Sequence, residues 1–168
     1  MDDDSRLLAL ALGTFHAVLI TLTAVVLLYL TVNLGEALAE LNTAVGLAVF
    51  GALWGTSVYC THRGITDAGL QPGREAPAAN VLRNGATWGA WNGMLFFWCL
   101  LAGGLLFLFL TAENGGQAAG VVVFGTVAFG VGTIASYAVG SFLGLLVAVL
   151  DIELLWAGRS LAGVQSRE

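Results

Sequence analysis

The sequence predicts an all-α fold: a polytopic transmembrane bundle of four helices, in one membrane domain over 1–168, with both termini in the cytoplasm. Of its 168 residues, 58% are hydrophobic and only 10% are charged, which is more apolar surface than one small soluble core can bury. Four stretches lack Asp, Glu, Lys and Arg, and each reaches the roughly 20 residues that one helical crossing of a bilayer needs. We therefore expect a multi-pass protein of the cell membrane whose first partner is the lipid bilayer.

The stretches without charged residues predict the helices, and the polar segments between them predict the connections. A short connection with Glu36 and Glu40 separates the first two helices, and the polar turn 113–117 separates the last two. The polar segment 62–86 holds both prolines and predicts a long loop between the two pairs. A polar tail is expected over 151–168. The predicted helices cover about 7–32, 43–61, 87–112 and 118–150.

The arginines set the expected orientation. The chain has no lysine, and with four crossings every arginine falls on the same side of the membrane. Because loops rich in Arg and Lys stay in the cytoplasm, both termini and the loop 62–86 are expected inside. These residues are Arg6, Arg63, Arg74, Arg83, Arg159 and Arg167.

The last apolar stretch leaves a fifth crossing open. As one helix, 118–157 would be roughly 60 Å long, about twice the thickness of the hydrocarbon layer. Small residues recur at every fourth position from Ala128 to Ala148, however, which requires one continuous helix. A fifth crossing would also move Arg159 and Arg167 outside, so we prefer four.

Small residues predict how the helices pack. Helices in lipid associate through close backbone contact and interhelical hydrogen bonds. One ridge lies near the start of the third helix, a second on the fourth, and a third, Gly51 with Gly55, on the second helix. We expect these ridges to pack inside the bundle, with any face left over serving a like or unlike partner. The residues of the first two ridges are Gly85, Gly89, Gly93, Gly132, Ser136, Gly140 and Gly144.

One histidine is expected at membrane depth. Counted from the nearest cytoplasmic charge, His16, Asn92 and Ser141 all lie nine or ten residues deep, roughly 14 Å from the inner face, and could form one polar layer. His16 would then be either a neutral hydrogen-bonding link to Asn92 or part of a proton or solute relay. The same count puts His62 and Asp151 at the inner face. It predicts that His16 has no carboxylate at its depth and shares no haem with His62.

Several classes of function are not expected. Without lysine there can be no Walker-type phosphate loop and no pyridoxal Schiff base. Cys60 and Cys99 are single, no HExxH or CxxC motif occurs, and no basic patch suits nucleic acid. Gly130 to Ala135 matches the dinucleotide pattern GxGxxA but lies inside an apolar helix. We therefore expect no enzyme activity, no cofactor, no metal site and no nucleic-acid partner.

Two pairs of short segments suggest an internal duplication. Residues 13–19 align with 89–95, and residues 44–51 align with 118–125, at offsets of 76 and 74. A two-helix hairpin repeated in the same orientation would explain both offsets, as in some transporters. Chance similarity among apolar residues is the alternative.

The whole chain resembles small multi-pass membrane proteins of haloarchaea. The resemblance lies in the acidic, lysine-free composition and in the segment GATWGAWNGMLFF at the start of the third helix. It transfers no function. Because small-residue ridges are dense and reactive groups few, we expect a non-catalytic assembly, accessory or scaffold subunit that forms homo- or hetero-oligomers. The alternative is a small permease or channel, proton-linked through His16.

Overall fold

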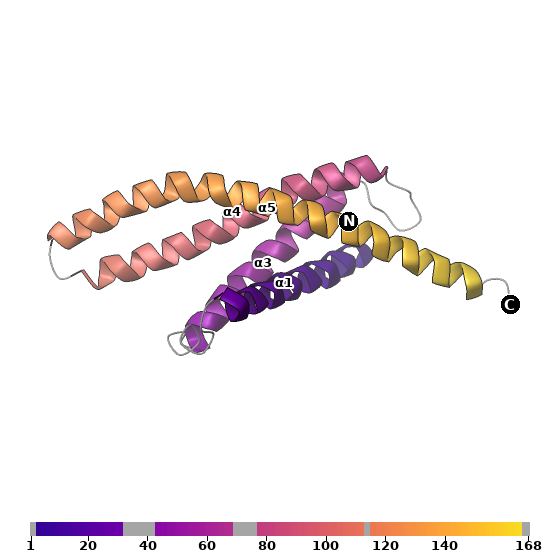
Figure 1. The fold of residues 1–168 in the computed structure, drawn as a ribbon, viewed down its shortest axis with the longest axis horizontal. Coiled ribbons are helices and arrows are strands. Elements are labelled where there is room, and N and C mark those ends of the chain that lie inside the picture. The colour runs from indigo at the N-terminus through magenta and orange to yellow at the C-terminus, as the bar shows by residue number, and fades with distance from the viewer. Residues whose placement is uncertain (1–2, 32–42, 69–76, 113–114, 166–168) are drawn as a thin grey trace.

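Four α-helices make up the part of the fold that the structure describes. The computed structural model describes residues 3–31, 43–68, 77–112 and 115–165, and within them the secondary structure is helical (Figure 1). All four helices are long and apolar enough to cross a membrane, so the predicted all-α class and helix count are confirmed. The helices are α1 (Asp3–Thr31), α3 (Thr43–Ala68), α4 (Ala78–Leu110) and α5 (Gly115–Gln165).

The helices extend further than the apolar stretches do. Helix α3 continues to Ala68 and α4 begins at Ala78, so much of the loop expected over 62–86 is helical. Pro77, which has no N–H to donate, lies at the N-cap of α4, where its carbonyl accepts a hydrogen bond from the Asn80 N–H at 2.9 Å. Polar residues on the last turns of α3 stay exposed without ending it, because a helix ends where its backbone pairing stops and not where its side chains turn polar.

Helix α5 also passes the expected boundary. It runs without interruption through Asp151 and Glu153 to Gln165, where a polar tail was expected from residue 151. Its backbone hydrogen bonds are local and continue past the two carboxylates. As a result, Asp151 lies well inside a helix rather than at its end.

The helices form two hairpins, α1 with α3 and α4 with α5, and contacts between α3 and α4 join them. The hairpins meet near the end at which α1 begins and α3 ends, and they diverge toward their other ends (Figure 1). Each hairpin is linked by a tryptophan that donates its indole N–H to a threonine hydroxyl at 3.0 Å: Trp54 to Thr14 in the first, Trp98 to Thr133 in the second. Such bonds contribute about 0.6–2 kcal/mol each between membrane helices.

Glycines let α4 and α5 approach backbone to backbone. A Cβ atom added at Gly93 would lie 2.6 Å from the Ser136 carbonyl oxygen and 3.0 Å from the Gly140 Cα. One added at Gly89 would meet the Gly140 carbonyl oxygen at 2.6 Å and would overlap the Gly144 Cα. The two predicted ridges therefore pack against each other within the chain. The third does not, because a Cβ at Gly51 or Gly55 would have no atom within 4 Å.

The packing registers of the two hairpins differ. In the first, Gly13 packs against Val58, whose backbone nitrogen would lie 3.0 Å from an added Cβ. In the proposed duplication, Gly89 corresponds to Gly13 and Gly132 corresponds to Val58. Gly89, however, packs against Gly140 and Gly144. The hairpins run in the same direction, but α5 is shifted by two to three helical turns relative to the proposed alignment.

Large apolar side chains point outward. Leu30, Leu110 and Ile134 are 71%, 74% and 75% exposed, whereas the buried apolar residues include small ones such as Ala9, Ala17, Ala90 and Ala148. This is the reverse of a soluble fold, in which large apolar groups fill the core. Small residues let the helix backbones approach one another in the interior, and large apolar side chains form much of the outer surface.

Gly89→Ala should destabilise the protein, whereas Gly103→Ala on the same helix should not. The added methyl at Gly89 overlaps α5 backbone atoms, while a Cβ at Gly103 would have no atom within 4 Å. We expect a loss of about 1–3 kcal/mol at Gly89 and a gain of up to about 1 kcal/mol at Gly103. Unfolding by SDS in mixed micelles measures both, and equal effects would contradict the packing described.

Candidate functional site

His16 connects three helices. It is buried on α1, and its Nε2 lies 3.2 Å from Asp151 Oδ1 on α5, while its Nδ1 lies 3.3 Å from Thr61 Oγ1 on α3. An ionised carboxylate only accepts hydrogen bonds, so the proton of a neutral imidazole belongs on Nε2, and Nδ1 then accepts the threonine hydroxyl. Protonation would make both ring nitrogens donors and leave an imidazolium beside a carboxylate. The cluster can therefore hold one more proton without breaking its geometry.

The predicted separation of Asp151 from His16 is wrong. Counting from charged residues put Asp151 about 14 Å from His16, yet the two side chains are in hydrogen-bonding contact. The count assumed that each helix leaves the membrane at its last charge, whereas α5 continues through Asp151 and α3 through Thr61. The expectation that His16 lacks a carboxylate at its level fails for this reason. The depth argument that separated His16 from His62 fails too, because Thr61 directly precedes His62.

Asn92 and Ser57 form a second polar pair next to the first. The Asn92 amide Nδ2 donates to Ser57 Oγ at 3.2 Å, and Ser57 is only 2% exposed. The side-chain carbonyl oxygen of Asn92 is buried and has no hydrogen-bond partner among the residues that the structure describes. Leaving such an acceptor unpaired costs about 1–3 kcal/mol, and a group of this kind in a native structure requires an explanation.

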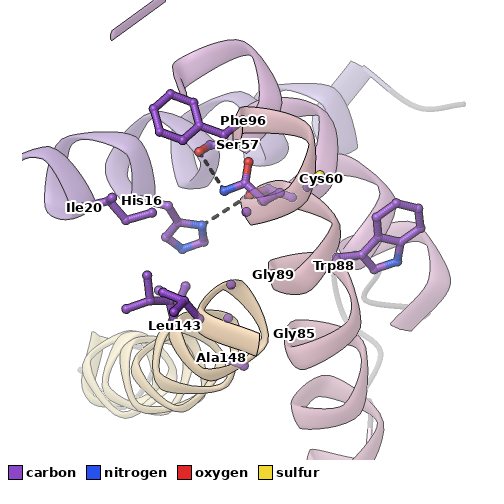
Figure 2. A pocket seen from close by; sticks show the side chains of 18 of the residues that line it. His16, Ile20, Ser57, Cys60, Gly85, Trp88, Gly89, Phe96, Leu143 and Ala148 are labelled. Carbon is purple, nitrogen blue, oxygen red and sulfur yellow. Dashed lines mark hydrogen bonds between the residues drawn. The ribbon is translucent and has the colours of Figure 1, made fainter. Parts of the chain in front are cut away.

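Both polar pairs line one cavity of about 470 Å³ between the four helices. Figure 2 shows the His16 ring pointing from α1 into the space bounded by Gly85 and Gly89 of α4 and by Leu143 and Ala148 of α5. The volume lies in the range typical of small-molecule sites. The polar residues of the lining are His16, Ser57, Thr61, Asn84, Asn92, Ser136 and Asp151.

The predicted polar layer is assembled in part. His16 and Asn92 line the same cavity, but among the residues that the structure describes, Ser141 is not part of the lining. Gly140 and Gly144 turn their side of α5 toward α4, and Ser141 lies about 100° around the helix from Gly140. Ser136, one turn earlier and on the side that faces α4, contributes the serine of α5 instead.

Ser57, Thr61 and Asp151 were not predicted as site residues, although their spacing carries a signal. Gly144, Ala148 and Asp151 are four and three residues apart, which places Asp151 on the same face as the small-residue ridge. Ser57 and Thr61 are likewise one turn apart on α3. Extending the small-residue ridge of α5 by one helical turn beyond Ala148 reaches the Asp151 carboxylate.

A separate polar cluster lies beside α3 and α4. The Trp88 indole donates to Asp67 Oδ2 at 2.9 Å, the rings of Trp88 and Tyr59 meet edge to face, and the Arg63 guanidinium lies 5.8 Å from the Tyr59 ring centroid. These contacts occupy Arg63 and Asp67 outside the His16 cluster. Within the described residues, no group of three or more His, Cys, Asp or Glu side chains could hold a metal ion.

A model of a protein family of unknown function, DUF7965, matches residues 5–168. The chain belongs to this family. The match covers all four helices and every residue of the His16 cluster. No curated protein and no solved structure matches the chain.

Removing both His16 and Asp151 should cost less than the sum of the single losses. In a double-mutant cycle of His16→Ala and Asp151→Ala, we expect a coupling energy of about 0.5–3 kcal/mol, because each single change leaves a buried partner unpaired. Pairing His16→Ala with Glu153→Ala is the matched control, since Glu153 is exposed on the same helix. SDS unfolding measures both cycles, and additivity in the first would refute the coupling.

Proposed function

We propose that this chain is a multi-pass membrane protein with both termini in the cytoplasm. Four helices of sufficient length and the outward-facing leucine, isoleucine and phenylalanine side chains support a lipid environment. Four crossings place all the arginines on one side, which supports the orientation. In Figure 1 the beginning of α1 lies with the end of α3 and the beginning of α4, as an even number of crossings requires.

Reporter fusions test this topology. Green fluorescent protein fused before Met1 or after Glu168 should fluoresce in both cases, because it folds in the cytoplasm. Alkaline phosphatase at the same two positions should stay inactive, while phosphatase inserted between Glu36 and Glu40 should be active. Opposite results at the two termini would rule out four crossings.

We further propose that the protein is a small proton-linked permease. The observation that carries this proposal is the His16–Asp151 contact beside a cavity formed by all four helices. Ionisable groups at membrane depth are costly, about 2.5–3.5 kcal/mol each on insertion scales, and typically mark a pathway or a proton relay. The unpaired Asn92 oxygen supports a second occupant of the cavity, because a solute with a donor group would satisfy it.

Each residue of the cluster has a part in the proposed function. His16 and Asp151 exchange the proton, and Thr61 orients the imidazole through its hydroxyl. Asn92, held by Ser57, presents its oxygen to the solute. Alternating access would come from movement of one hairpin against the other, since contacts between α3 and α4 join them.

A role as an assembly subunit is the second candidate. The exposed Gly51 and Gly55 on α3 favour it, because this ridge has no partner among the described residues of the chain. The ridges that first suggested assembly, on α4 and α5, pack against each other instead. This use inside the chain shifts the balance toward the permease.

Proton movement in proteoliposomes tests the permease. With a pH-sensitive dye inside, a solute added outside should change the internal pH, using in turn benzamidinium, benzenesulfonate and benzamide as cationic, anionic and neutral probes. We expect at least one probe to move protons, and His16→Leu to abolish the change because it removes the proton-binding ring. His62→Leu is the matched control. No response to any probe would refute the permease.

A further inference from the structure

We infer that the cavity selects apolar organic cations, with Asp151 as the counter-charge. This inference rests on the proposed permease function and names its substrate class. Three properties of the lining carry it: its charge, its hydrogen-bonding groups and its apolar wall.

The charge of the lining is negative. With His16 neutral, Asp151 is the one charged group among the lining residues, and no arginine belongs to the lining. Of the arginines whose side chains the structure describes, Arg63 lies over the Tyr59 ring and Arg6 and Arg83 are outside the lining. The Asp151 side chain is 19% exposed. A carboxylate so placed attracts a cation more strongly than one in water does, and repels an anion.

The hydrogen-bonding groups that remain for a solute include acceptors. The Asn92 oxygen has no donor, and its Nδ2 already donates to Ser57. The Thr61 hydroxyl hydrogen and the His16 Nε2 proton are both used within the His16 cluster. An ammonium or amidinium group brings donors to such acceptors.

The rest of the wall is apolar and partly aromatic. It includes Ile20, Phe96, Phe97, Leu100 and Leu143, and Figure 2 shows Phe96 beside Ser57 at the polar end. Aromatic rings favour cations over anions through their electron-rich faces. A small hydrated metal ion does not suit this wall, because it needs several oxygen ligands. An organic cation with an apolar body matches both parts of the cavity.

Protons should compete with this cation. The titratable side chains that line the cavity are His16 from α1, Cys60 from α3 and Asp151 from α5, and α4 contributes the neutral Asn84 and Asn92. A proton taken up by His16 forms an imidazolium next to Asp151 and cancels the negative charge that attracts the cation. One bound cation therefore replaces one proton, and their exchange across the membrane moves no net charge.

Two ions of the same shape and opposite charge test the selection. Tetraphenylphosphonium and tetraphenylborate are compared by equilibrium dialysis against purified protein in mild detergent, with protein-free micelles as the blank. We expect the phosphonium to bind at pH 8, and to bind roughly tenfold or more weakly at pH 5, because protons compete with it for the charge of Asp151. The borate should not bind above the blank.

Variants of neighbouring carboxylates identify the counter-charge. Asp151→Asn should weaken phosphonium binding roughly tenfold or more, Asp151→Glu should retain most of it, and Glu153→Gln, an exposed position two residues away, should leave it unchanged. Circular dichroism and gel filtration verify that each variant is folded. The pH dependence of the unmodified protein needs no variant and tests the same charge.

The outcomes separate this inference from the permease. Equal binding of both ions, or equal effects of the changes at Asp151 and Glu153, would overturn the cation selectivity. If only benzenesulfonate or benzamide moves protons in proteoliposomes, the permease stands and the selectivity fails. If phosphonium binds through Asp151 but no probe moves protons, the selectivity stands and the permease fails.

Discussion

The backbone contact between α4 and α5 determines where the other groups of the molecule lie. Glycines on both helices remove the side chains that would hold them apart, so the carbonyl oxygens of Ser136 and Gly140 approach α4 directly. This contact fixes the register of α5. One turn beyond Gly144 lies Ala148, and three residues further Asp151 reaches His16 on α1. A different register between α4 and α5 would leave the histidine without its carboxylate.

The site that results combines satisfied and unsatisfied groups. His16 has a partner on each ring nitrogen, and these partners come from two other helices, so its orientation is determined by the fold. Asn92 is only half paired, since its amide donates to Ser57 while its oxygen is left over. In the proposed function, the first arrangement positions a proton and the second provides an attachment point for a solute. A purely structural polar contact would satisfy both ends of the amide.

The helical class, the helix count and the small-residue ridges could be read from the sequence, because the lack of charge and the fourfold spacing are properties of each segment alone. His16 and Asn92 could be predicted as residues of one site for the same reason. The contact of His16 with Asp151 could not be predicted by counting, since it depends on how far α5 slides along α4. The prediction that Ser141 shares a polar layer with His16 failed, because the depth of a residue does not determine which way its side chain faces. The sequence does not show where α3 ends and α4 begins, because a helix does not stop where its side chains become polar.

The length of α5 has a mechanical consequence. At 51 residues it is one helix of about 75 Å. The cavity lies along it, and its far end, Gln165, lies fourteen residues beyond Asp151. Its helical backbone is continuous from Gly115 to Gln165, and no proline interrupts it. It acts as a lever whose fulcrum is the glycine contact with α4. A tilt of a few degrees at that fulcrum would be amplified into a larger displacement of its far end.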